Sequence, residues 1–240
     1  ATSGANTVII DYNVGDVGGG VCQHVIGTFT ADAVTQAFTL SGGASNQINA
    51  MQLRTLVSGK WSGGVSGVWD DTTLNFTGTS FTSAKAAGTV EFFDTDSNSV
   101  AVVRNAITIQ NGGVTGANVL LNSAALAYTF NSSDANGIKG AFTVTKNGAA
   151  VVNLAGANTH TGDTNLSAGT LNLAHSSALQ NSTLNYTGGT LGFTNGLTAH
   201  SIGNLKGNQT ITLTNNAAAA VTLTVGSNNQ SATYFGALGG

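Results

Sequence analysis

Apolar residues recur at every second position in several short runs of this chain, and this alternation constrains the fold most. The runs are Thr-Leu-Asn-Leu (170–173), Thr-Leu-Asn-Tyr (183–186), Thr-Ile-Thr-Leu (210–213) and Val-Thr-Leu-Thr-Val (221–225). Because side chains alternate between the two faces of a strand, each run predicts a β-strand with one buried and one solvated face. We therefore expect an all-β protein built from many short strands.

Charged residues are scarce, and this limits the classes of partner. Residues 147–240 carry only two full charges, Asp163 and Lys206, and the whole chain has a formal net charge of −3. A nucleic-acid-binding protein needs a basic patch, which seven scattered Lys and Arg residues do not supply. No apolar run approaches the roughly 20 residues of a membrane helix. We expect neither a nucleic-acid partner nor a membrane span, and the lone Cys22 allows no internal disulfide.

Turn-forming pairs separate the predicted strands at short intervals, for example Asn136-Gly137, Gly188-Gly189 and Asn195-Gly196. These intervals are too short for helical crossovers, which leaves antiparallel meanders or sandwiches, and a β-solenoid. An internal echo favours the solenoid, because Thr-Leu-Asn-Phe-Thr-Gly (73–78) returns as Thr-Leu-Asn-Tyr-Thr-Gly (183–188). Short units that stack on copies of themselves are typical of solenoids.

One segment carries a recognisable pattern of Lys, Gly, Leu, Asn and Thr. It covers residues 142–173 and reads FTVTKNGAAVVNLAGANTHTGDTNLSAGTLNL. This segment resembles the autotransporter-associated β-strand repeat, also called the passenger-associated transport repeat. The positions that match are Lys146, Gly148, Val152, Leu154, Gly156, Asn158, Gly162, Thr164, Leu166, Gly169 and Leu171. The chain departs from the pattern at Ala149-Ala150, where Gly is common, and at His160, where Tyr is usual.

The resemblance implies a fold, a location and a domain organisation. It implies a right-handed parallel β-helix that is exported to the bacterial cell surface or beyond, with no enzyme activity. We expect residues 61–240 to form the solenoid, with repeat-like rungs clearest at 142–173. Residues 1–60 are expected to be a β-rich segment that caps the solenoid or contacts another subunit.

The sequence offers few candidates for chemistry. Asp94, Asp96 and Asn98 are spaced like the start of a calcium loop, but Ser99 and Asn105 stand where such a loop wants Gly and Glu, so the calcium interpretation is weak. The acidic residues and the four His residues are too dispersed to predict a catalytic carboxylate pair or a zinc site. We therefore predict no catalytic residues, no cofactor and no enzyme. Aromatic residues concentrated between Trp61 and Phe130 are interpreted as core or cap packing, with sugar stacking as the alternative.

These observations favour a structural protein of the cell exterior that assembles with copies of itself. A solenoid exposes unpaired backbone groups at an end that has no cap, and the C-terminal segment has no evident polar or helical cap. The residues expected to make the head-to-tail contact are Thr7, Val8, Ile9, Ile10, Tyr12, Tyr234, Phe235 and Leu238. Such contacts build a fibre, filament or surface layer. The alternative is a monomeric adhesin or a glycan-binding passenger, with surface glycans as partners.

Overall fold

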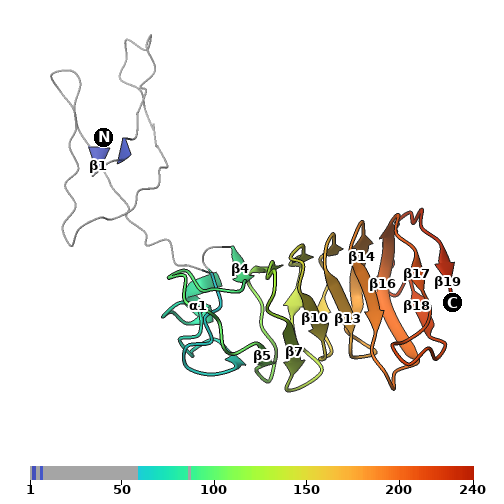
Figure 1. Cartoon of the computed structure of the whole chain (residues 1–240), viewed down its shortest axis with the longest axis horizontal. Coiled ribbons are helices and arrows are strands. Elements are labelled where there is room, and N and C mark those ends of the chain that lie inside the picture. The colour runs from blue at the N-terminus through green and yellow to red at the C-terminus, as the bar shows by residue number, and fades with distance from the viewer. Residues whose placement is uncertain (1, 4–5, 8–58, 86–87) are drawn as a thin grey trace, which may run out of the picture. The chain divides into compact units, whose positions relative to one another are not determined.

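The computed structural model describes residues 2–3, 6–7, 59–85 and 88–240, and the chain divides into two units, Ala1–Arg54 and Thr55–Gly240. In the first unit, β1 (Thr2–Ser3) pairs antiparallel with β2 (Asn6–Thr7). In the second unit, every pairing between named strands is parallel, and the strands wind into a β-solenoid of about 6 turns (Figure 1). The expected all-β solenoid is thereby confirmed.

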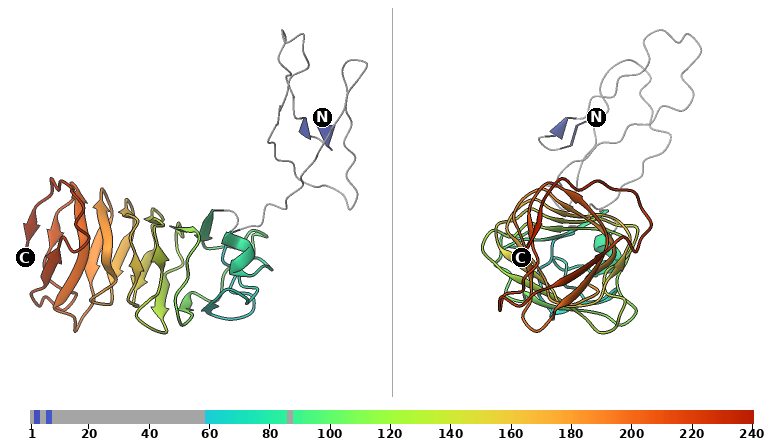
Figure 2. Two further views of the ribbon diagram at one scale, coloured as in Figure 1. Left: turned by 180° about the vertical axis from the view of Figure 1, so that it is seen from behind. Right: turned by 90° about the vertical axis from the view of Figure 1, so that its right-hand side faces the viewer.

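Two long parallel sheets form most of the wall of the solenoid, and we call each a column. The first column stacks β3 (Val68–Trp69), β5 (Ala106–Ile109), β7 (Tyr128–Ser132), β10 (Val151–Leu154), β13 (Thr170–Leu173) and β15 (Thr190–Phe193). The second stacks β4 (Thr89–Phe92), β6 (Asn118–Leu121), β9 (Val144–Lys146), β12 (Thr164–Leu166), β14 (Leu179–Tyr186), β16 (Ala199–Gly207) and β18 (Thr222–Val225). Seen end on, the strands surround a filled interior (Figure 2).

The remaining elements are short. A third face is formed by β8 (Lys139–Gly140) and β11 (Thr159–His160), and the first half of β14 continues it. At the end of the stack β17 (Ile211–Thr212) pairs with β19 (Leu238–Gly239). The single helix among the described residues is α1 (Phe81–Ala84). No helix in the described part of the chain has the length and apolar character needed to cross a bilayer.

The predicted alternation sets which side chains enter the core. In β13, Leu171 and Leu173 are buried while Thr170 and Asn172 are half-buried on the outer face. The register keeps like positions in line, because Leu171 lies between Val152 and Leu191 in the stack. In the second column the middle rungs advance by equal steps, from Val144 to Thr164 and on to Leu184. Each rung therefore buries its apolar face against its neighbours.

The two copies of the repeated sequence that favoured a solenoid, residues 73–78 and 183–188, do not occupy equivalent positions in the rungs. Residues 183–186 lie in β14, which among the described strands pairs with β12 and β16, so the copy at residues 73–78 does not stack on it. Residues 73–78 contain no named strand. There the Asn75 side chain is buried and accepts the backbone N–H groups of Val65 and Ser66 at 3.0 and 2.9 Å. Its environment therefore differs from that of Asn185, whose amide bonds to Asn165 in the rung below.

The aromatic residues of the first rungs are packed together inside. The rings of Trp69 and Phe92 lie 5.1 Å apart, and those of Phe92 and Phe130 lie 4.9 Å apart in an edge-to-face arrangement. The buried members of this aromatic cluster are Trp61, Trp69, Phe76, Phe81, Phe92, Tyr128 and Phe130. Because their rings are buried, these residues pack the start of the solenoid and do not present a surface for sugar stacking.

Candidate functional site

The residues predicted to make head-to-tail contacts fall in two places. Tyr234, Phe235 and Leu238 lie in the last rung, where Tyr234 bridges to Gly207 and the N–H of Phe235 donates to the Gly207 carbonyl at 2.8 Å. Phe235 is 80% exposed and Leu238 57%. Thr7 belongs to β2, and Val8, Ile9, Ile10 and Tyr12 lie outside the described residues. The structure therefore describes Thr7 and the three C-terminal residues of this set, and the contact between copies stays a prediction.

The carboxylates of the calcium candidate face different parts of the chain. Asp94 accepts the backbone N–H groups of Ala124, Ala125 and Leu126 at 2.8, 3.0 and 2.6 Å. The Leu126 bond is the main cause that lowers the pKa of Asp94. Asp96 instead accepts the N–H groups of Asn98 and Val100, so it closes its own turn. Both carboxylates stabilise loops here, and calcium binding by this segment stays a prediction.

One inner corner of the second column holds three long side chains with polar tips, Lys146, Tyr186 and Tyr234. The register places Lys146, Leu166, Tyr186, Gly207 and Tyr234 in successive rungs at this corner. The Lys146 ammonium is fully buried and donates to the carbonyls of Gly148 and Ala168. The Tyr186 hydroxyl donates to the Gly189 carbonyl at 3.1 Å, and the Tyr234 hydroxyl donates to the Gln209 carbonyl.

These donors satisfy carbonyls that the tight corner turns away from the strand ladders. Burial lowers the pKa of Lys146, whose partners in the described structure are neutral carbonyls. Gly169 and Gly189 adopt φ values of +67° and +73° at this corner, where a Cβ on Gly189 would lie 2.5 Å from the Gly169 carbonyl oxygen. The corner therefore stabilises the fold. It could not be predicted from the sequence, because the register that aligns these residues is not visible there.

A second polar chain crosses the interior at the third face. His160 Nε2 lies 3.0 Å from Thr164 Oγ1, which lies 2.8 Å from Ser182 Oγ, and Ser182 donates to the Gly162 carbonyl at 2.7 Å. Since the single proton of Ser182 goes to Gly162, Thr164 must donate to Ser182 and His160 must donate through Nε2. Nδ1 is then a bare acceptor, and it is buried with no hydrogen-bond partner among the described residues. Burial lowers the pKa of His160 to about 4.

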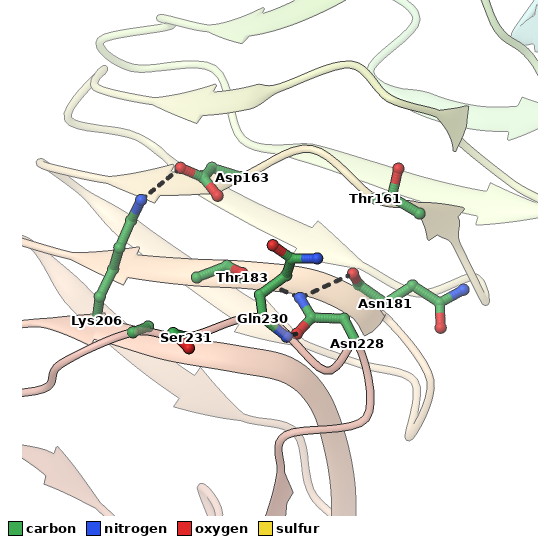
Figure 3. Close-up of a pocket in the computed structure, with 9 residues that line it drawn as sticks. Thr161, Asp163, Asn181, Thr183, Lys206, Asn228, Gln230 and Ser231 are labelled. Carbon is green, nitrogen blue, oxygen red and sulfur yellow. Dashed lines mark hydrogen bonds and ion pairs between the residues drawn. The ribbon is translucent and has the colours of Figure 1, made fainter.

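An open, polar groove lies on the outer surface beside the second column (Figure 3). Its volume is about 530 Å³. An ion pair of 2.6 Å between Asp163 and Lys206 lies on one side of the groove, Asn181 and Asn228 lie on the other side, and Gln230 lies between the two sides (Figure 3). The residues that line it are Thr161, Asp163, Asn181, Thr183, Lys206, Asn228, Gln230, Ser231 and Ala232. Nothing in the sequence signalled this groove, because its walls come from several rungs that are distant from one another along the chain.

The described residues do not assemble a metal-binding cluster. No group of three or more His, Cys, Asp or Glu side chains in this part of the structure could hold a metal ion. The acidic residues near the groove and the loops serve as capping groups or ion-pair partners, as Asp163 does with Lys206.

Comparison with known proteins gave one match. Searches of curated proteins and of solved structures found no match. The family model of the passenger-associated-transport-repeat matches residues 144–173. In the structure these residues run from β9 through β10, β11 and β12 to the end of β13, which is about one and a half turns of the solenoid. Residues 144–173 therefore match the passenger-associated-transport-repeat model, and they fold as part of a parallel β-solenoid.

Proposed function

We propose that the protein is an exported, non-enzymatic structural component of the bacterial cell exterior that assembles head to tail with copies of itself. The repeat at 144–173 and the solenoid fold fit a protein like an autotransporter passenger. The observation that carries the assembly proposal is that, among the described strands, β18 pairs with β16 on one side only. We call the other side of β18 the open edge.

The backbone of β18 supplies donors that face outward. The N–H of Thr222 donates to the Thr198 carbonyl, toward the body of the solenoid. Because successive residues of a strand direct their N–H groups to opposite sides, the N–H groups of Leu223 and Val225 face the open edge. An exposed row of such groups is a template for pairing with another strand. A copy of this chain would add its own strand there in parallel.

Exposed apolar side chains collect toward the two ends of the described solenoid, and this also supports end-to-end contact. Within the described residues, Val151 is the exception in the middle of the stack. The first rungs carry Val65, Val68, Leu74, Val100 and Val103, and the last carries Val225, Phe235 and Leu238. With few charges on the chain, repulsion between copies is weak.

The test is the state of association of the purified chain. Sedimentation velocity over rising concentration should show species larger than the monomer, and negative-stain images should show rods longer than one solenoid. Val225→Pro removes one outward N–H and is expected to shift the protein toward monomer, while Val225→Thr keeps that N–H and serves as the matched control. A wild-type chain that remains a short, isolated rod at every concentration would overturn assembly and favour the monomeric adhesin.

A further inference from the structure

The last rung departs from the others where it turns toward the second column. In the rung before it, the chain passes from Ile202 to Gly207 by a short path along the wall. The register partners of these two residues in the last rung, Val225 and Tyr234, are separated by a stretch that is longer by four residues. The additional residues cannot follow the wall of the solenoid, so residues 226–233 form a flap.

The flap folds back over earlier rungs and is held there by specific hydrogen bonds. Ser227 Oγ donates to the Gln180 carbonyl, and Asn228 Nδ2 donates to Thr183 Oγ1 at 3.0 Å. The Asn204 amide donates to the Gln230 carbonyl. Gly203 leaves the space for this approach, since a Cβ there would lie 2.8 Å from Asn228 Nδ2. The flap is therefore held in place by hydrogen bonds and forms one wall of the groove.

Beside the flap, the wall is shaped by a second irregularity, which the flap contacts through the carbonyls of Gln180 and Asn181. In β14 the register with β16 shifts between Leu179 and Thr183, which forms a bulge at residues 180–182. Asn181 lies in this bulge and lines the groove. Two independent departures from the regular repeat thus create one cavity, whose volume falls in the range of about 300–1,000 Å³ that small-molecule sites occupy.

The chemistry of the lining selects a class of ligand. The side chains of Asn181, Gln230 and Thr161 make no hydrogen bond within the described structure, where only backbone atoms of Asn181 and Gln230 are engaged, so their side-chain donors and acceptors are available. Asp163 and Lys206 neutralise each other at 2.6 Å, so the groove carries no net charge for an ionic ligand. Amides, hydroxyls and a paired carboxylate offer both donors and acceptors to sugar hydroxyls.

We propose that this groove binds a neutral oligosaccharide, with Gln230 and Asn181 as the main hydrogen-bonding side chains. The site lies on the side wall, so the inference goes beyond the proposed assembly and does not depend on it. No aromatic residue lines the groove to supply a stacking platform. We therefore expect weak binding, with a Kd on the order of 1 mM.

The experiment is ligand-observed NMR followed by titration of the full chain with malto-, cello- and N-acetylchito-hexasaccharides. We expect saturation transfer from at least one of them. The double variant Asn181→Ala/Gln230→Ala should weaken binding roughly tenfold, the effect of two lost hydrogen bonds of about 0.7 kcal/mol each. Asn195→Ala, at an exposed turn away from the groove, is the matched control and should bind as the wild type does.

Each other outcome overturns the proposal. If no neutral hexasaccharide shows saturation transfer, the groove is not an oligosaccharide-binding site. Binding confined to acidic oligosaccharides such as heparin fragments contradicts a groove without net charge, and equal binding by the double variant places the ligand elsewhere. Sedimentation of the same variant separates this inference from assembly, because groove substitutions leave the outward N–H groups of β18 in place.

Discussion

The first rungs and the middle rungs of the solenoid bury their apolar faces in different ways. In the first rungs the register takes a long step, from Thr89 to Asn118, and large aromatic rings fill the interior. In the middle rungs the step is shorter and constant, and the core is mainly aliphatic, with tight glycine corners. In this molecule, equal register steps accompany an aliphatic core, whereas the long register step of the first rungs accompanies a core of large aromatic rings. Four measurements test this contrast.

Truncation in the aromatic cluster should have the largest effect. Trp69 is fully buried with its ring 5.1–6.2 Å from those of Phe76, Phe81, Phe92 and Phe130. Trp69→Ala should lower the free energy of unfolding by about 3–5 kcal/mol, because it leaves a large cavity. Urea denaturation measures this.

Two further variants calibrate that result. Val103→Ala, at a side chain that is 75% exposed, should change stability by less than about 0.5 kcal/mol. Leu171→Ala in the middle rungs should cost about 2–4 kcal/mol. If Trp69→Ala costs less than Leu171→Ala, the aromatic cluster is not the main support of the first rungs.

Acid should weaken the middle rungs through His160. Its pKa is about 4 in the folded chain, below the ordinary value of 6.5, so the unfolded state binds more protons between these two pH values. Stability therefore falls as the pH drops from 6.5 to 4, by roughly 3 kcal/mol in total. Denaturant titrations at several pH values check the slope.

His160→Gln should remove most of this pH dependence while keeping a polar side chain. His200 is also buried, and burial lowers its pKa, so His200→Gln is the companion variant that accounts for the remaining slope. Destabilisation below pH 4 belongs to aspartates such as Asp94, whose pKa is lowered. An unchanged slope in both His variants would show that protonation of the buried imidazoles does not control acid stability.

The glycine corner should tolerate no side chain. Gly189→Ala forces a Cβ to within 2.5 Å of the Gly169 carbonyl and also meets the penalty of a positive φ. We expect a loss of about 2–4 kcal/mol. Gly196→Ala carries a φ of +82° with nothing within 4 Å of the added Cβ, so it should cost only about 1 kcal/mol. Equal losses in thermal or urea unfolding would mean that close stacking at the corner is unimportant.

The outer ladder of amides should contribute least. Asn172 Nδ2 donates to Asn153 Oδ1 at 2.8 Å on the half-buried outer face. Asn172→Ala should lower stability by about 1 kcal/mol, since a net hydrogen bond is worth about that much. Asn195→Ala at an exposed turn should be neutral. If Asn172→Ala lowers stability as much as Leu171→Ala does, the hydrogen bonds on the outer face stabilise the rungs as strongly as core packing does, which contradicts this ranking.

Much of the fold could be predicted because the alternation is local. Leu171 and Leu173 point inward as the pattern indicates, and the short turn spacing excluded helical crossovers. The repeat at residues 144–173 was also readable, since its Gly and Asn positions are set by corners. The Thr-Leu-Asn echo was misleading because a strand motif does not say which column it joins.

The sites depended on register, which a Thr-rich and Asn-rich strand specifies weakly. Lys146 differs in type from Tyr186 and Tyr234, and the three residues fall at unequal intervals, so only the stack shows that they share one position. The groove needs both the flap at 226–233 and the bulge at 180–182, and neither irregularity has a sequence signature.

The flap also shows how such a molecule can acquire new surfaces. Additional residues enter one turn between two strands, yet Val225 still pairs with Ile202 and Tyr234 still bridges to Gly207. Insertions at these bends leave the hydrogen-bonding ladders intact, so a graft of foreign peptide at the exposed bend around Asn195 and Gly196 would be displayed without cost to the scaffold beneath.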